Sequence, residues 1–498
     1  TGQDQKTDAS FFGRWQRGKA TRWLSPELER QALEAATQQH YRAAAARLSV
    51  GVFGRRLRQQ GDRHYRTAAL TVLLSDGDAG LRWVREREFE QSVWLLDRWH
   101  IGQRLREFVG PCGEHGTPAL SRSTSTSTSK SKSTSKRLPS TVNPSPPNIV
   151  LICADQHRAD TLGAYGSRVC ATPHLDRLAR QGVTLERCFA QNPVCAPSRS
   201  TILSGLISRR HGVRTNGYPL SRKIPTLADI CRAAGYRTAA VGKTHLAPQM
   251  EGVPAAPHYG FDQLDPCEDN KVGPYLDWAL ANFPEHEGYL LGTLFNLPTN
   301  EAYWHGKRDL RREYRAARAR CVLPLEISPT CNWGFGHYSS LPEAAHHNAW
   351  ITDRAIAQIG AAPPGQPLFL WVGYVEPHNP FDPPPRFREL YRAADMPLPV
   401  HLDADESRLP VATRSLRAYF KSFTTRDHQI LRSLYYGSVT FLDEQVGRLL
   451  AAIDRRLDPA QTIMVYLADH GELLGDHGIY GKSCYHYDPG IRVPFIAR

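Results

Sequence analysis

Two kinds of hydrophobic pattern alternate along the second part of the chain. Continuous apolar runs begin at residues 148 (NIVLICAD), 237 (RTAAVGK), 366 (QPLFLWVGYV) and 462 (TIMVYLADHG). Such runs, without polar alternation, are typical of parallel strands buried on both faces. Helices are predicted between them, two ending at Gly182 and Gly235 and two over residues 349–360 and 427–453. The pattern predicts an α/β fold with a mainly parallel sheet sandwiched by helices, whose ligands bind beyond the carboxyl ends of the strands.

A shorter alternation precedes it in residues 1–115. A helix is predicted for residues 28–46, followed by two strand-and-helix pairs that begin with TAALTVLLSDGD and SVWLLD. Asp76 and Asp78 end the first of these strands and Asp97 ends the second. We therefore expect a small α/β fragment ahead of the main domain.

The two parts are joined by a segment of different composition. Residues 121–138, SRSTSTSTSKSKSTSKRL, are almost entirely Ser, Thr, Lys and Arg, and a Pro-containing stretch follows. Such a segment cannot bury enough apolar surface to offset its ordering entropy. The sequence thus predicts a flexible, disordered linker over residues 116–146 and a separate domain over 147–498.

The net charge of +13 is concentrated before the domain. Residues 1–146 hold 24 Lys and Arg against 14 Asp and Glu, whereas the remaining residues hold 38 against 35. Only the first part therefore has an electrostatic reason to bind nucleic acid.

Composition excludes several classes of protein. The apolar runs are far shorter than the roughly 18 residues of a membrane span, so a transmembrane chain is excluded. The chain does not begin with a basic and then apolar signal pattern, which makes a cytoplasmic location the default expectation and leaves a periplasmic or secreted one open. Ten cysteines are too few for a disulfide scaffold of this length.

Acidic residues follow two of the apolar runs directly. Asp155 and Gln156 come after the first run, and Asp469 and His470 come after the last. Because the ends of parallel strands meet at one edge of a sheet, these side chains can converge on one hard cation. The alternative is that each Asp only caps the following helix. A second potential ligand beside each Asp favours the metal site.

One cysteine precedes a predicted helix. The segment NPVCAPSRSTILSG places Cys195 at that position, with Arg199 four residues later. Amide dipoles at the start of a helix favour an anion, so a nucleophile there is activated and a bound anion is held. A small buried hydrophobic role is the alternative for a single Cys.

Six sequence elements in the second part occur in one characteristic order. They are PNIVLICADQHRADTLGAYG, CAPSR, GKTHL, EPHNPF, ADHGELLGDHG and the closing GK with GIRVPFI. Through these elements residues 147–498 resemble the sulfatase family of the alkaline-phosphatase-like superfamily. CAPSR matches its C-x-P-x-R signature.

The resemblance implies a sulfuric ester hydrolase that cleaves sulfate monoesters of small molecules or carbohydrates. Cys195 would be converted by a formylglycine-generating enzyme to formylglycine, whose hydrate supplies the nucleophilic hydroxyl. Pro197 and Arg199 belong to the recognition signature, and Lys243 and Arg199 would steady the formylglycine oxygens.

The resemblance also assigns the proton transfers. His245 would take a proton when the sulfated intermediate returns to the aldehyde. His378 and Lys482 would bind the sulfate and help to protonate the leaving alcohol. Histidines titrate near neutrality, which suits such transfers, and cationic groups around the sulfuryl centre would stabilise its developing charge.

The metal ligands implied by the resemblance surround the same cysteine. One divalent cation, usually calcium in sulfatases, would be held by Asp155, Gln156, Cys195, Asp469 and His470. Two positions depart from the common pattern, because Gln156 replaces an acid and His470 replaces an Asn. The site loses a carboxylate and gains a nitrogen ligand, so manganese or another divalent metal becomes an alternative. Phosphonate monoester hydrolases have the same Asp-Gln and Asp-His pattern of ligands. Phosphonate or phosphodiester hydrolysis is therefore an alternative function.

Two further resemblances concern the ends of the chain. Family members usually continue into a smaller C-terminal subdomain, and from VPFIAR at the end of this sequence we expect that subdomain to be missing.

Residues 60–110 resemble a fragment of a transposase with an RNase-H-like domain, with Asp76 or Asp78 and Asp97 at its acid positions. A competing hypothesis is therefore a non-catalytic fusion whose first part binds DNA weakly through its excess of Arg.

Overall fold

The computed structural model describes residues 146–248, 258–294, 297, 308–320, 335–400, 406–482 and 485–498. The fragment predicted for residues 1–115, and the predicted linker up to residue 145, lie outside the described residues. The fold below is that of the second part of the chain.

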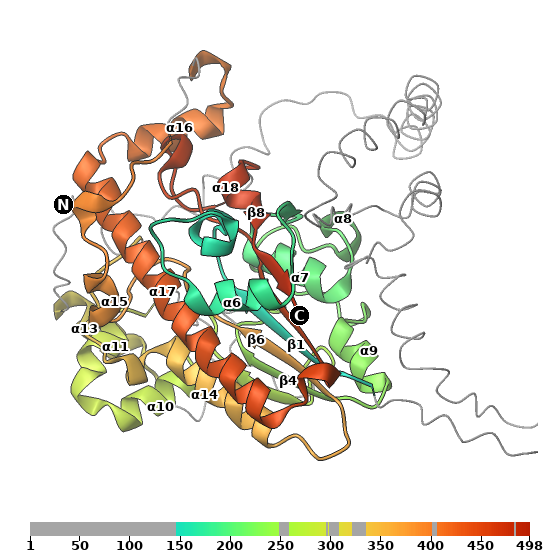
Figure 1. Ribbon diagram of the computed structural model, residues 1–498. Coiled ribbons are helices and arrows are strands. Elements are labelled where there is room, and N and C mark those ends of the chain that lie inside the picture. Colours follow the sequence, from blue (N-terminus) through green and yellow to red (C-terminus); the bar gives the residue numbers. More distant parts are fainter. Residues whose placement is uncertain are drawn as a thin grey trace, which may run out of the picture. The chain divides into compact units, whose positions relative to one another are not determined.

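A seven-stranded sheet forms its centre, in the order β2-β9-β7-β1-β6-β4-β5. Figure 1 labels three of its neighbouring strands, β1, β6 and β4. The neighbours β7, β1, β6, β4 and β5 run parallel to one another. Only β9 at one side reverses direction, pairing antiparallel with β7 and with β2. The mainly parallel sheet predicted from the apolar runs is confirmed. The strands are β1 (Asn148–Ala154), β2 (Val183–Thr184), β4 (Arg237–Gly242), β5 (Gln263–Pro266), β6 (Leu368–Gly373), β7 (Thr462–Ala468) and β9 (Phe495–Ala497), and a separate two-stranded sheet pairs β3 (Cys188–Phe189) with β8 (Arg492–Val493).

Helices cover both faces of the sheet. They are α6 (Pro173–Gln181), α7 (Cys195–Ser204), α8 (Ser208–His211), α9 (Leu227–Ala233), α10 (Pro274–Asn282), α11 (Glu287–Gly292), α13 (Arg311–Arg320), α14 (His347–Gly360), α15 (Pro385–Glu389), α16 (Val411–Phe420), α17 (Thr425–Arg456) and α18 (Asp488–Ile491). The four helices predicted from helical spacing correspond to α6, α9, α14 and α17.

The alternation of side chains along β1 divides the core into two layers. Val150 and Ile152 join a cluster with residues of α6, α10, α14 and α17. Ile149 and Leu151 point to the other face, where they pack with residues of α7 and α9. Both layers are apolar, which is why the strand has no polar alternation.

The long helix α17 begins two residues before the predicted start. Thr424 accepts a hydrogen bond from the Asp427 amide, and the Asp427 carboxylate accepts one from the Thr424 amide. This capping box satisfies amides that a helix start leaves without partners. The apolar spacing alone does not reveal a polar first turn.

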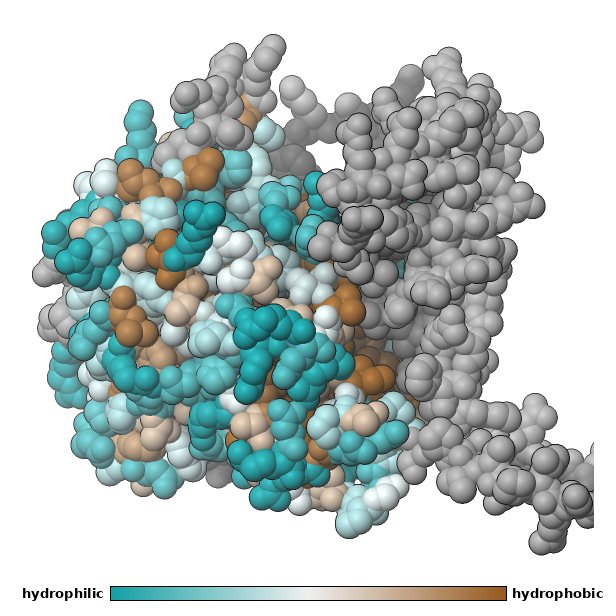
Figure 2. Space-filling view, in the orientation of Figure 1, coloured by the Kyte–Doolittle hydropathy of each residue, from teal (hydrophilic) through white to brown (hydrophobic). Residues whose placement is uncertain are grey.

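The surface of the domain is chemically mixed. On the face shown in Figure 2, hydrophobic residues occur as separate patches among hydrophilic ones. In the part of the chain that the structure describes, no helix combines the length and the apolar character of a membrane span. Scattered exposed apolar side chains are ordinary, so the search for a site turns to buried polar groups.

Asp443 joins α17 to α6, and its replacement tests that junction. Its two carboxylate oxygens accept the His174 and Leu175 amides at 3.0 and 2.8 Å, at the start of α6. We expect Asp443→Asn to lower the free energy of unfolding by about 1–3 kcal/mol, because one buried amide loses its acceptor.

Urea unfolding followed by circular dichroism measures the difference. Glu444→Gln, which removes the same charge from the adjacent and more exposed residue, serves as the control and should change stability by less than about 0.5 kcal/mol. Equal losses in the two variants would contradict this account of the junction.

Candidate active site

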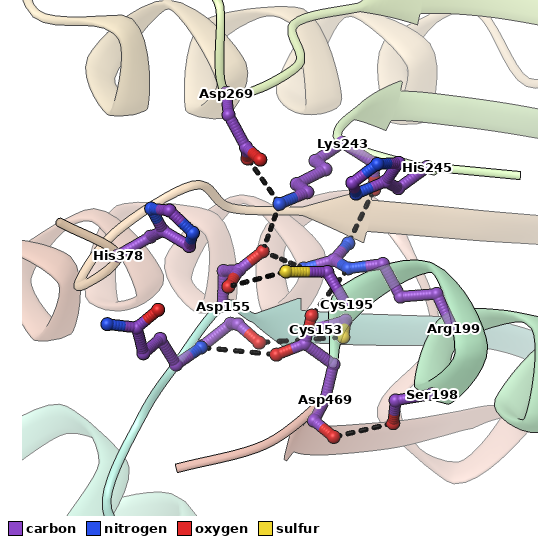
Figure 3. Close-up of polar contacts among 12 residues, drawn as sticks. Cys153, Asp155, Cys195, Ser198, Arg199, Lys243, His245, Asp269, His378 and Asp469 are labelled. Carbon is purple, nitrogen blue, oxygen red and sulfur yellow. Dashed lines mark hydrogen bonds and ion pairs between the residues drawn. The ribbon is translucent and has the colours of Figure 1, made fainter. Parts of the chain in front are cut away.

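The carboxyl ends of four neighbouring strands bring polar side chains to one place. Asp155 directly follows β1, Lys243 follows β4 and Asp469 follows β7, while His378 lies in the loop after β6. Figure 3 shows Asp155 at the centre, with Lys243, Cys195 and Asp469 around it. These residues are far apart in the sequence and meet because the strands are parallel.

Arg199 holds the two aspartates in position. Its Nε lies 2.7 Å from Asp469 Oδ2, and its terminal nitrogens donate to Asp155 Oδ2 at 3.1 Å and to the Lys243 carbonyl at 2.7 Å. All three charged side chains have no exposed surface. The guanidinium donates to protein groups in three directions, so its role in the structure is to position the aspartates and the end of β4.

Cys195 is the first residue of α7 and is fully buried. Its Sγ lies 2.9 Å from Lys482 Nζ, 3.3 Å from His470 Nε2 and 3.9 Å from Asp155 Oδ1. Burial alone would raise the pKa of the thiol, but the nearby Lys243 and Lys482 outweigh it and lower the pKa well below its usual value. An anion is therefore stabilised at this position.

Lys243 is enclosed by acidic partners. Its Nζ lies 2.5 Å from Asp155 Oδ2 and also contacts Asp269 Oδ1. Burial would lower the pKa of the ammonium, but Asp155 and Asp269 raise it well above its usual value. Lys243 is thus a permanent cation beside Cys195.

Asp269 was not predicted from the sequence. One ligating atom each of Cys195, Asp269 and His378 lie within 4.8 Å of one another. Burial would raise the pKa of Asp269, but Lys243 lowers it to about 2. Asp269 lies beyond β5 in the segment DPCEDN, where no pattern distinguishes it from other loop acids; only its position opposite Lys243 reveals it.

Four residues at this edge of the sheet form a group that could hold a metal ion. Asp155, Cys195, Asp469 and His470 each offer one atom, and these atoms lie within 4.8 Å of one another. His470 Nδ1 lies 2.9 Å from the Gly471 carbonyl, which can only accept a hydrogen bond. The neutral ring therefore carries its proton on Nδ1 and presents the Nε2 lone pair to the group.

Gln156 is a further candidate ligand, through its amide oxygen. Gln156 Nε2 donates to Asn379 Oδ1 at 3.1 Å and to Glu472 Oε2 at 2.5 Å. Its Oε1 is buried without a hydrogen-bond partner. The backbone adopts a φ of 63°, and its amide donates to Asp469 Oδ1 at 3.1 Å. A buried oxygen without a partner suits a cation, so the residues present fit a divalent metal.

The remaining predicted residues surround Cys195. His245 has a φ of 51°, its amide donates to Glu268 Oε1, and its side chain hydrogen-bonds Cys195. His378 Nδ1 lies 2.5 Å from the Asn379 carbonyl, which leaves Nε2 as the other ring nitrogen for proton transfer. Lys482 approaches from the last segment of the chain and keeps 16% of its side chain exposed. The structure thus brings the ten residues predicted for the hydrolase site to one edge of the sheet, whereas Asp76, Asp78 and Asp97 lie outside the described residues.

Comparisons with known proteins show what the described domain is similar to. The family model described as Sulfatase matches residues 147–498. The chain is 28% identical to an arylsulfatase of Clostridium perfringens over 352 residues, covering 70% of this chain and 68% of the relative. It is also 28% identical over 381 residues to a multifunctional alkaline phosphatase superfamily protein of Trinickia caryophylli, with the same coverage. Among solved structures, a phosphonate monoester hydrolase from Silicibacter pomeroyi shares 25% identity at a TM-score of 0.55, covering 71% of this chain and 68% of that one.

Cobalt binding tests the metal group without an activity assay. We expect the unmodified chain to bind Co²⁺ with a thiolate-to-metal charge-transfer band. The pKa of Cys195 is lowered, so its sulfur is ionised at pH values below about 8.5, the usual pKa of a cysteine thiol. Cys195→Ser should lose the band and keep the metal, whereas Asp469→Asn should weaken binding itself. A band that persists in Cys195→Ser would place the sulfur outside the group.

Glu472→Gln tests the orientation of Gln156. Glu472 Oε1 accepts the Leu474 and Gly481 amides, so a glutamine there must turn its own amide nitrogen toward Gln156 Nε2. Two donors would then face each other and Gln156 would rotate. We expect metal affinity at this group to fall about 10- to 100-fold, measured by calorimetric titration with Mn²⁺. Glu444→Gln is the matched control, and equal affinities for the two variants would rule out this positioning role.

Proposed function

The chain belongs to the sulfatase family, and we propose that it hydrolyses sulfate monoesters at the group around Cys195. The surroundings of Cys195 Sγ carry the proposal: two lysines, two histidines and an aspartate converge on an atom at the start of a helix. A sulfate ester is a monoanion whose transition state places more charge on its oxygens. Fixed cations in a buried site stabilise such charge.

The nucleophile would be a formylglycine made from Cys195 by a formylglycine-generating enzyme. Pro197 and Arg199 complete the C-x-P-x-R signature, and Cys195 Sγ stands where the new oxygen would lie. When hydrated, this group supplies a hydroxyl that can attack sulfur. Lys482 and Lys243 supply the positive charge that favours an anionic oxygen at that position.

A divalent cation would be held by Asp155, Gln156, Asp469 and His470, together with the atom at position 195. When bound, it supplies positive charge to the sulfuryl oxygens. Calcium is the usual family choice, and the imidazole of His470 also suits manganese. Arg199 keeps both aspartates directed at this place.

Two histidines lie where proton transfers are needed. His245, hydrogen-bonded to position 195, would accept a proton from the oxygen there. His378 and Lys482 also lie close to this position and would bind the sulfate and give a proton to the leaving alcohol. Asp269 would hold Lys243 between two carboxylates.

A second candidate is the hydrolysis of phosphonate monoesters or phosphodiesters at the same site. This candidate is favoured by the two pairs of proposed metal ligands, Asp155 with Gln156 and Asp469 with His470. The likeness to a phosphonate monoester hydrolase also favours it. These esters are also monoanions with a tetrahedral centre, so the same cations would stabilise them. A single experiment can rank the two.

The test is to co-express the full chain with a formylglycine-generating enzyme and assay it. Peptide mass spectrometry should show the thiol-to-aldehyde mass loss at Cys195. Turnover of an aryl sulfate should exceed that of an aryl phosphonate monoester, and Cys195→Ala should lower both by more than about 10³-fold. His211→Gln, which changes a buried histidine outside the site, is the control. Efficient conversion without sulfate turnover would reject the sulfatase proposal, and faster phosphonate turnover would select the second candidate.

A further inference from the structure

A second group of ligating side chains lies outside the active site. His346 and His347 stand at the start of α14, and Glu376 and Asp382 follow β6 in the loop that also carries His378. Each of the four is at most 1% exposed. Ligating atoms of His346, His347 and Glu376 lie within 4.8 Å of one another. The mechanism proposed above uses none of these four side chains.

Four atoms of this group are buried without a hydrogen-bond partner. They are His346 Nε2, His347 Nε2, Glu376 Oε2 and Asp382 Oδ1. Buried polar atoms almost always have a partner, and a group of exceptions calls for an ion or water. Four exceptions in one place are therefore a signal in themselves.

The spacing of the group supports an ion. His347 Nε2 lies 3.6 Å and His346 Nε2 lies 3.8 Å from Glu376 Oε1, and His346 Nε2 lies 4.0 Å from Asp382 Oδ1. These distances are too long for hydrogen bonds. They are close to the separation of about 3.4 Å between neighbouring ligands of a tetrahedral ion bound at about 2.0–2.2 Å.

We propose that His346, His347, Glu376 and Asp382 form a structural site for one divalent transition-metal ion of the zinc class. Two imidazoles and two carboxylates are a donor set that zinc accepts. The ligating atoms of His346, His347 and Glu376 already lie within 4.8 Å of one another, and the side chain of Asp382 would have to move toward them to close the coordination shell. The complete burial of the four residues requires that the ion enter during folding.

The charged side chains around the group do not occupy the position between its ligating atoms. Lys271 Nζ lies 3.1 Å from Asp382 Oδ2, and His337 Nε2 lies 3.6 Å from the same oxygen, so Oδ1 remains for the ion. Glu376 forms ion-pair contacts with the two imidazoles, and its carboxyl group also interacts with the side chains of Ser438 and Asp382. A divalent ion would compensate the buried carboxylate of Glu376.

Coordination has one local cost. His346 Nδ1 accepts the Asn348 amide at 3.2 Å and so caps α14. An ion on Nε2 moves the ring proton to Nδ1 and replaces this contact. The first turn of α14 would therefore be held by the ion instead of by the cap.

The position of the site explains what the ion would do. Glu376 is two residues before His378, and Lys271, which pairs with Asp382, is two residues after Asp269. The ion would fix the start of α14 to the loop of His378, and Asp382 would link it to the loop of Asp269. It would thus hold two active-site loops without touching the substrate.

Zinc content of the full chain tests the proposal independently of turnover. Each protein is expressed with Zn²⁺, passed through gel filtration and measured by mass spectrometry of the metal. We expect about two zinc ions per wild-type chain and about one in His347→Gln, with about one in His470→Gln, which impairs the active-site group. His211→Gln, the matched change of another buried histidine, should keep about two.

The outcomes decide between an ion and a metal-free network. Zinc content in His347→Gln equal to wild type would overturn the proposal. If His347→Gln does not fold, X-ray absorption of the zinc retained by His470→Gln decides instead. A zinc ion bound by two imidazoles and two carboxylates would support the proposed site. A folded His470→Gln chain that retains no zinc would refute it, and the buried Glu376 would then be protonated instead of bound to an ion.

Discussion

The ion pairs between Arg199 and the aspartates at the ends of β1 and β7 are the interaction on which the active edge of the sheet depends. Arg199, Asp155 and Asp469 have no exposed surface. A buried charge without a partner costs several kcal/mol, so loss of one member would leave the others destabilised. Because Arg199 also binds the Lys243 carbonyl, the same group ties α7 to three strands of the sheet.

Close backbone packing places Lys243 within this network. Gly242 has a φ of 79°, and a side chain there would collide with the Gly373 carbonyl. That carbonyl instead accepts the Lys243 amide at 2.8 Å, and Trp371 Nε1 donates to the Lys243 carbonyl at 2.9 Å. The end of β4 can thus press against β6, which directs the Lys243 ammonium toward Asp155 and Cys195. The glycine is required by geometry and not by chemistry.

Different residues orient the proposed metal ligands and surround position 195. Arg199 donates hydrogen bonds to Asp155 and Asp469 and orients them. Glu472 accepts a hydrogen bond from Gln156 and orients it. Lys482, His245 and His378 surround position 195 and remain for a substrate. Fixed cations around a tetrahedral centre stabilise its negative charge whichever element lies at that centre. This is why sulfate and phosphonate esters are both reasonable substrates for one set of residues.

The sequence by itself determined the element types and much of the candidate chemistry. Uninterrupted apolar runs indicated β1, β4, β6 and β7, because strands buried on both faces tolerate no polar alternation. Acids after two of these runs and the CAPSR segment pointed to the site. Tertiary structure alone decided three matters: that Asp269 faces Lys243, that Glu472 accepts a hydrogen bond from the Gln156 side chain, and that His346, His347 and Glu376 meet. Each depends on contacts between segments distant in the chain, and local periodicity carries no information about which loop side chains become neighbours once the parallel strands align.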